Sequence, residues 1–160
     1  MNVTLEYLQH DDLQEYKLLL DAVLGETVGL EVMQARYQTD HPYVKTVVAK
    51  LLCEKPTQCF ETKKGSEMIG SITFVLIDTF TGGNDPRIEF SNFAVTPAAR
   101  GTDTAKMLME FVTDYARDFG YNSVTVNCGV NAARAHTFYE KMGFVRDDKA
   151  RFVKVIDTSK

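Results

Sequence analysis

Phe93-Ala94-Val95-Thr96-Pro97-Ala98-Ala99-Arg100-Gly101-Thr102-Asp103-Thr104-Ala105 is the stretch that decides the fold. It is typical of a strand, a tight turn and the first turn of a helix. A glycine-containing turn of this kind aims several backbone N–H groups at one point before the helix. The positive end of the helix dipole makes that point suitable for a phosphate or pyrophosphate. Asp103 conflicts with this reading because it brings a negative charge to the same place.

The turn is neither a P-loop nor a dinucleotide fingerprint, because both glycine patterns are missing. An ordinary helix start, with Thr102 or Asp103 as N-cap, is the alternative reading.

The segments around the turn predict a single α/β domain over residues 1–160. Asp12 and Glu15 resemble a capping pair for the first helix. Segment 44–52 has helical spacing, but its valines fit a strand equally well. Strands are expected at 3–7, 58–62, 68–77, 88–95, 123–128, 144–145 and 151–156, and helices after Asp12 and at 30–37, 104–119 and 131–142.

The central part of this order is a β-α-β unit around helix 104–119. Strands 88–95 and 123–128 should therefore be parallel neighbours in a mixed sheet. Helices 104–119 and 131–142 then both begin at one edge of the sheet, where ligands of open α/β sheets usually bind.

Composition excludes several classes of function. The formal charge of −4 argues against nucleic-acid wrapping, and the apolar run 69–77 is too short to cross a membrane. The N-terminus does not resemble a signal peptide. Cys53, Cys59 and Cys128 lack metal-ligand spacing and are expected to be reduced thiols of a cytoplasmic protein, with no metal site.

Asn131-Ala132-Ala133-Arg134-Ala135-His136-Thr137-Phe138-Tyr139-Glu140-Lys141-Met142-Gly143-Phe144 is the second informative stretch. Together with the turn, it resembles the GNAT superfamily of N-acetyltransferases. The first family motif is matched by Val95, Pro97, Arg100, Gly101 and Ala105, and the second by Asn131, Phe138, Tyr139, Glu140, Lys141, Gly143 and Phe144. Asp103 stands where the family has glycine, and Arg134 stands at an alanine position.

The resemblance implies a GNAT-like fold with a central mixed, mostly antiparallel sheet. It also implies an N-acetyltransferase with acetyl-CoA as cosubstrate. The acetyl group would pass directly to a primary amine of a small molecule or peptide in a ternary complex, because no cysteine lies in a nucleophile–base motif. The backbone of Phe93, Ala94 and Val95 would pair with the pantetheine arm, and Asn131 would hydrogen-bond it. Arg134 would lie near the nucleotide phosphates, and the pyrophosphate would be held by backbone N–H groups of Arg100, Gly101, Thr102, Asp103, Thr104 and Ala105.

The same resemblance supplies two catalytic candidates. Tyr139 would act as general acid and protonate the departing thiolate; the alternative is a core aromatic beside Phe138. Glu89 is the candidate general base, because Ser91 stands where the family often has glutamate and Glu89 shares its strand face. An exposed strand carboxylate is the alternative for Glu89, and Ser91 and Asn92 could instead hold a water chain.

Two accounts of Asp103 are open. Its side chain could turn outward and cap the helix, which is the account we favour, or its charge could be offset by Thr102, Thr104, Arg100 and Lys106. A carboxylate a few ångströms from a diphosphate costs about 1 kcal/mol in water. His136 is read as a surface histidine, and Cys128 as a small buried hydrophobe.

The acceptor site is the least defined part of the sequence. Candidate lining residues are Tyr37, Asp40, His41, Tyr43, Asp78 and Asp85. Homodimerisation is expected by family analogy only. A non-catalytic CoA-binding or regulatory domain of the same fold, and a structural α/β module, are the alternatives to the enzyme.

Overall fold

The computed structural model describes residues 2–53, 65–78, 86–147 and 151–157. The strand expected at 58–62, Cys59 and Asp85 lie outside the described residues. The chain divides into two compact units, Met1–Asn127 and Cys128–Lys160, and each is described by itself. A single domain over the whole chain stays a prediction.

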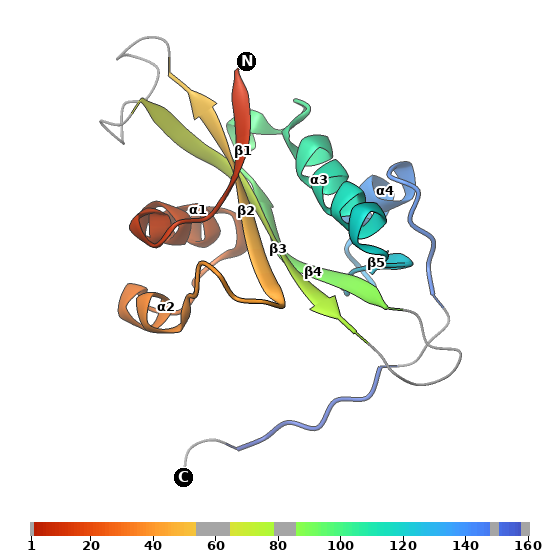
Figure 1. Cartoon of the computed structure of the whole chain (residues 1–160). Helices are drawn as coiled ribbons and strands as arrows, with labels where there is room; N and C mark the ends of the chain where they lie inside the picture. The colour runs from red at the N-terminus through yellow and green to blue at the C-terminus, as the bar shows by residue number, and fades with distance from the viewer. Residues whose placement is uncertain (1, 54–64, 79–85, 148–150, 158–160) are drawn as a thin grey trace. The chain divides into compact units, whose positions relative to one another are not determined.

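The first unit is built on one mixed sheet with strand order β1-β2-β3-β4-β5 (Figure 1). Strands β1 to β4 pair antiparallel, and β4 pairs with β5 in parallel, as the β-α-β unit predicts. The strands are β1 Val3–Tyr7, β2 Val44–Leu52, β3 Ser66–Ile77, β4 Arg87–Val95 and β5 Ser123–Thr125. The last strand is shorter than the expected 123–128.

Segment 44–52, for which the sequence left two readings open, is a strand. Val47, Val48 and Ala49 are consecutive and all fully buried. β2 lies between β1 and β3, and both of its faces are covered. Such a strand has apolar residues on both faces, so its sequence imitates helical spacing.

Helices cover the two faces of this sheet. α1 Leu13–Leu24 and α2 Leu30–Arg36 lie on one face, and α3 Thr104–Phe119 lies on the other (Figure 1). Adjacent residues of β3 show the division. The Thr73 hydroxyl contacts Tyr16 of α1, whereas the Phe74 ring packs against Tyr115 of α3 at a centroid distance of 5.2 Å. Short 3-10 turns, His10–Asp12 (η1) and Pro97–Ala99 (η2), precede α1 and α3.

The predicted capping pair at the start of α1 is wrong. Asp12 occupies the N-cap position, but its side chain makes no cap hydrogen bond. Asp12 instead accepts a bond from Lys50 at 3.1 Å, and Glu15 accepts the backbone N–H of Met68 at 2.8 Å. Both carboxylates therefore fasten α1 to the sheet.

The second unit contains α4 Ala133–Lys141, which is shorter than the expected helix 131–142. The strands expected at 144–145 and 151–156 are wrong, because residues 144–147 and 151–157 form no strand. Apart from the half-buried Phe144, their large apolar side chains are exposed, Phe152 at 94%. A β-type sequence needs a neighbouring strand to pair with, and the described part of this unit contains none.

The expectation of three reduced cysteines is wrong for Cys53, which is disulfide-bonded. Cys128 is a free thiol. The cytoplasmic location therefore loses its support from cysteine chemistry and stays a prediction. Among the described residues, no helix combines the length and apolarity needed to cross a membrane.

Gly70 of β3 sets the distance between the sheet and α3. A methyl group at this position would lie 3.0 Å from Leu108 Cδ1 and 3.2 Å from both Ala94 O and Thr104 Cγ2. Thr104 and Leu108 are the first buried residues of α3, and each is at most 1% exposed. The absence of a side chain at Gly70 thus allows the start of α3 to rest directly on the sheet.

Gly70→Ala should lower the free energy of unfolding by about 1–3 kcal/mol, because the added methyl overpacks the helix–sheet contact. Urea denaturation should show a lower midpoint and an unchanged slope. Gly65→Ala is the matched control, since a methyl there meets nothing within 4 Å. Equal stability of the two variants would contradict this account of Gly70.

Candidate functional site

A β-bulge interrupts β4 just before the segment that the sequence singles out. Thr73 faces Ser91 and Ser71 faces Ala94, so one residue of β3 opposes both Asn92 and Phe93. Asn92 has a φ of 48°, a conformation that asparagine tolerates better than most residues. A bulge bends its strand and re-aims the residues that follow.

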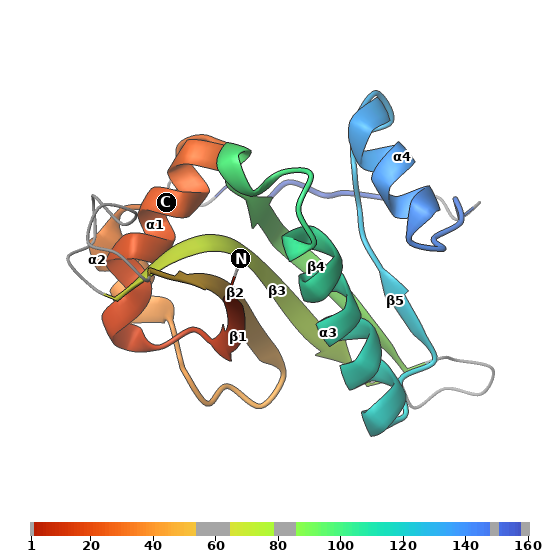
Figure 2. The same ribbon diagram turned by 90° about the horizontal axis from the view of Figure 1, so that it is seen from above.

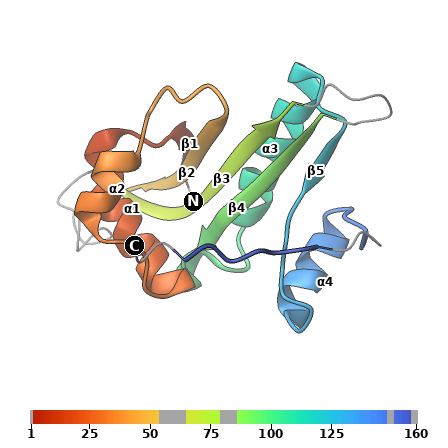
Figure 3. The ribbon, with the colours of Figure 1, turned by 90° about the horizontal axis from the view of Figure 1, so that it is seen from below.

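Beyond the bulge, β4 presents an open edge. Thr96 N–H donates to Ile69 O at 2.9 Å, and strand geometry then turns the N–H and C=O of Val95 away from β3. On that side β5 pairs only with Arg87–Glu89 and ends at Thr125 (Figure 3). Within the described part of the first unit, no strand pairs with the edge at Val95.

The chain continues from this edge through η2 into α3 (Figure 2). Gly101 has a φ of 79°, which confirms that the turn needs a glycine there. The first backbone hydrogen bond into α3 runs from Met107 N–H to Asp103 O at 2.8 Å. The N–H groups of the first helical turn, Ala105 and Lys106 included, have no carbonyl acceptor in a helix. The helix start therefore has backbone donors available where the sequence predicts an anion, and the binding itself stays a prediction.

Asp103 holds the N-cap position, but its exposed side chain makes no cap hydrogen bond. The expectation that its carboxylate caps the helix is therefore wrong. Thr102 does this instead, because its hydroxyl accepts Thr104 N–H at 3.4 Å and lies 3.0 Å from the Thr104 hydroxyl. A short capping hydroxyl already occupies the space, which leaves the carboxylate in solvent. Offset of its charge by Arg100 and Lys106 stays a prediction.

Glu89 lies on the α1 face of β4, together with Ser91. Its neighbours Ile88 and Phe90 are buried on the α3 face. The half-buried Glu89 carboxylate accepts a hydrogen bond from Asn127 Nδ2 at 2.7 Å. Asn127 was not among the sequence candidates. The parallel register pairs Glu89 with Thr125, so the residue two positions further along could have been predicted on the same face.

Tyr139 belongs to the second unit and is half-buried on α4. Its ring packs against Phe138 at 5.7 Å and Phe144 at 5.6 Å, and its carbonyl accepts Phe144 N–H at 2.9 Å. Burial, with a smaller contribution from Cys128, raises the pKa of the Tyr139 phenol. The phenol therefore stays protonated at neutral pH. Cys128 is exposed, so its reading as a buried hydrophobe is wrong.

His136 is half-buried and bonded through both ring nitrogens. Its Nε2 lies 2.9 Å from Gly129 O, and Arg146 donates to its Nδ1 at 3.1 Å. A carbonyl can only accept and an arginine can only donate, so the neutral ring protonated at Nε2 satisfies both partners. His136 thus ties together the two segments that flank α4.

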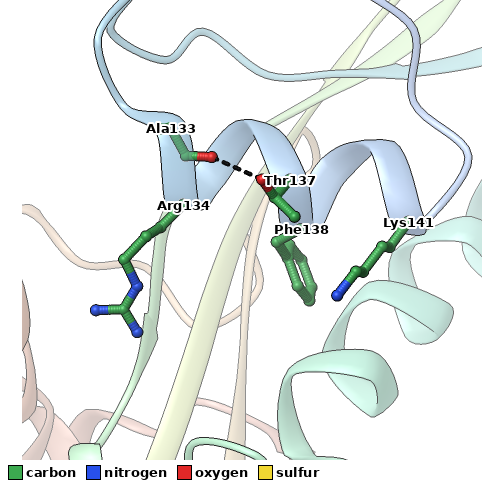
Figure 4. Close-up of a pocket in the computed structure, with 5 residues that line it drawn as sticks. All are labelled: Ala133, Arg134, Thr137, Phe138 and Lys141. Atoms are coloured by element: carbon green, nitrogen blue, oxygen red, sulfur yellow. Dashed lines mark hydrogen bonds between the residues drawn. The ribbon is translucent and has the colours of Figure 1, made fainter.

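One side of α4 carries two cations around an apolar ring (Figure 4). Arg134 and Lys141 project beside Phe138 and line an open hollow of about 370 Å³ with Ala133 and Thr137. Arg134 was a sequence candidate for phosphate binding, whereas Lys141 was only a motif match. Asn131 precedes this helix, is exposed, and its carbonyl accepts Ala133 N–H at 3.0 Å.

Several acceptor candidates have structural partners. The Tyr37 hydroxyl donates to Leu8 O, and burial raises the pKa of Tyr37 to about 12. His41 Nδ1 accepts the N–H groups of Tyr43 and Val44, both at 3.1 Å, at the start of β2.

Burial, with a smaller contribution from the nearby Asp78 carboxylate, raises the pKa of Tyr121 to about 12. Asp40 and Tyr43 are exposed. None of these candidates lines the hollow beside Phe138.

Comparison with known proteins identifies the class. Residues 26–144 match the model of the acetyltransferase (GNAT) family. A glucosamine 6-phosphate N-acetyltransferase of Trypanosoma brucei brucei is 24% identical over 144 residues, which are 90% of each chain. The mouse (Mus musculus) protein named probable N-acetyltransferase family 8 member 5 is 34% identical over 70 residues, 44% of this chain and 31% of that protein.

Solved structures show the same fold. The aminoglycoside N-acetyltransferase AAC(6')-Iy, in complex with a CoA-containing bisubstrate analogue, superposes with a TM-score of 0.75 at 12% identity. The match covers 98% of this chain and 100% of that one. The fold and the family model define an acetyltransferase. The chain belongs to the acetyltransferase (GNAT) family.

Proposed function

We propose that this chain transfers the acetyl group of acetyl-CoA to a primary amine on a small molecule. The proposal rests on three features that follow one another along the chain: a strand edge, a turn and a helix start. The open edge of β4 at Val95 runs directly into a turn and helix start with N–H groups available to an anion. A strand edge suits the amides of a pantetheine arm, and a helix start suits the pyrophosphate attached to it.

The binding roles follow the same order along the chain. The backbone of Phe93–Val95 holds the pantetheine arm, and the N–H groups of residues 100–105 hold the pyrophosphate. Asn131 and Arg134 of the second unit contribute to the arm and to the nucleotide phosphates. The two cations beside Phe138 support the last assignment, since phosphate is bound by cationic side chains.

Glu89 and Tyr139 divide the proton transfers. When bound, acetyl-CoA supplies the thioester whose C–S bond breaks as the amine nitrogen forms the new amide bond. Glu89, directly or through water, accepts the proton that the amine loses. Tyr139 donates a proton to the leaving sulfur and later regains one from solvent, so the products are the N-acetylated amine and the free thiol. The hydrogen bond from Asn127 fixes the direction of the Glu89 carboxylate.

The acceptor class rests on the comparisons. Two similar proteins are named for amino sugars, glucosamine 6-phosphate and an aminoglycoside. Glu89 and Ser91 share the face of β4 that α1 covers, which is the side of the sheet on which α1 and α2 lie. The acceptor candidates Tyr37 to Tyr43 follow α2 directly in the chain. A peptide amine, a homodimer and a cytoplasmic location stay predictions.

Tyr139→Phe should reduce turnover at least tenfold and leave acetyl-CoA affinity unchanged, because it removes only the donated proton. The raised pKa of Tyr139 extends its protonated form to higher pH. The wild-type rate should therefore hold past pH 10 before it falls, and the variant should lack that fall. A thiol-release assay over a panel of amines measures both. Tyr7→Phe is the matched control, and full activity of Tyr139→Phe would remove Tyr139 from the mechanism.

Glu89→Gln should lower the rate at neutral pH and recover part of it as the pH rises, because the amine then loses its proton without help. The amide keeps an oxygen that can accept the Asn127 hydrogen bond, so the strand geometry is preserved. Glu110→Gln, on the exposed side of α3, serves as control. A rate equal to wild type at neutral pH would rule out Glu89 as the base.

Asp103→Gly should tighten acetyl-CoA binding by about fivefold in low salt and leave turnover similar, because it removes a charge that repels the diphosphate. The gain should shrink as salt screens the repulsion. Calorimetry at two salt concentrations tests both statements. Asp103→Asn is the second variant, because it removes the same charge and keeps a side chain of the same size. Unchanged or weaker binding by both variants would contradict the repulsion.

A further inference from the structure

A cluster of buried hydroxyl groups lies on the α1 face of the sheet. The hydroxyls of Thr46 and Thr73 face each other across β2 and β3 at 2.8 Å, and the Tyr16 hydroxyl lies 3.3 Å from that of Thr73. All three residues are at most 8% exposed. A polar cluster of this kind in a sheet core specifies one arrangement of the elements that it joins. Here it joins α1, β2 and β3.

Two hydroxyls of this region reach the bulge of β4. Ser71 is fully buried, and its Oγ donates to the Asn92 carbonyl at 3.1 Å. Burial raises the pKa of the Tyr16 phenol, and the Asn92 side chain lies close enough to its hydroxyl to lower that pKa in part. Asn92 is thus bonded at its carbonyl from β3 and faced at its side chain by α1. We name Ser71 and Tyr16 the bulge brace.

The brace acts where the backbone needs support. Asn92 has a positive φ and stands at the bulge, where the β3–β4 register shifts. Such a residue keeps an uncommon conformation only when its surroundings determine it. Phe93–Val95 follow immediately, so the conformation of Asn92 sets the direction in which their N–H and C=O groups point.

We propose that Ser71 and Tyr16 are positioning residues for acetyl-CoA. They fix Asn92, and Asn92 fixes the open edge that receives the pantetheine arm. This inference rests on the proposed function, since it concerns the same edge. Neither residue touches the ligand, and neither takes part in proton transfer.

The test uses Ser71→Ala and Tyr16→Phe, each of which deletes one hydroxyl and preserves the apolar shape. The dissociation constant of acetyl-CoA, measured by calorimetry, should rise about threefold to tenfold in each variant, as expected for loss of one hydrogen bond. In the ligand-free protein, the amides of residues 93–95 should exchange hydrogen faster. The double variant should show less than the product of the two effects, because both hydroxyls act on Asn92.

Thr113→Ala and Tyr115→Phe are the matched controls on α3. The Thr113 hydroxyl bonds Met109 O at 2.9 Å, away from the bulge. Wild-type affinity and exchange in both brace variants would overturn the proposal. A lower melting temperature with an unchanged dissociation constant would also overturn it, because the hydroxyls would then be structural only. If the wild-type protein fails to bind acetyl-CoA, the proposed function itself fails, and the inference fails with it.

Discussion

The unequal pairing of β4 on its two edges is the constraint on which the candidate site depends. One edge of β4 pairs with β3 along the strand as far as Val95, whereas β5 pairs with the other edge only at Arg87–Glu89. The bulge at Asn92 falls between the paired and the open part. Within the first unit, the groups proposed to hold acetyl-CoA lie in the open part or in the turn that follows it. Everything proposed for the base uses the paired part, where Asn127 reaches Glu89.

Two contacts keep this strand and the following helix in place from opposite faces. On the α3 face, the missing side chain of Gly70 brings the first turn of the helix against β3 and β4. On the α1 face, carboxylates and hydroxyls add directional bonds to the apolar contacts that pack the helix on the sheet. A helix held by directional bonds has one allowed register against the sheet. The first unit thus fixes both the distance of α3 from the sheet and the direction of β4.

The sequence predicted the elements that have strong local signals. Helix 104–119 is found with the same bounds, because an amphipathic pattern ends there at Gly120 in a left-handed conformation. Strand 3–7 and the parallel pair follow from alternation and from the handedness of β-α-β units. Segment 44–52 could not be decided, since a strand buried on both faces has no alternation. The strands after residue 143 failed for a different reason: their composition favours β-structure, but composition does not supply a partner strand.

At the site, the sequence predicted the turn and the place of Asp103 before the helix, and the family resemblance pointed to the backbone of Phe93–Val95. It missed contacts that depend on register. The contact of Asn127 with Glu89 can be predicted only when the register that pairs Thr125 with Glu89 is known. Glu15 looked like a capping residue because sequence distance cannot show that Met68 N–H is its nearest donor. Asp103 was assigned a cap that Thr102 already provides. Neighbouring polar residues compete for the same few N–H groups, and the sequence does not state which one prevails.

The open edge at Val95 also affects the tendency of the protein to self-associate. A strand edge with unpaired backbone groups is a template on which another chain can add a strand, and native proteins usually block such edges. If acetyl-CoA lies along this edge as proposed, the ligand completes the sheet as an additional strand would. Saturation with cosubstrate would then protect the protein from self-association as well as prepare it for catalysis. The empty state would be the one exposed to aggregation.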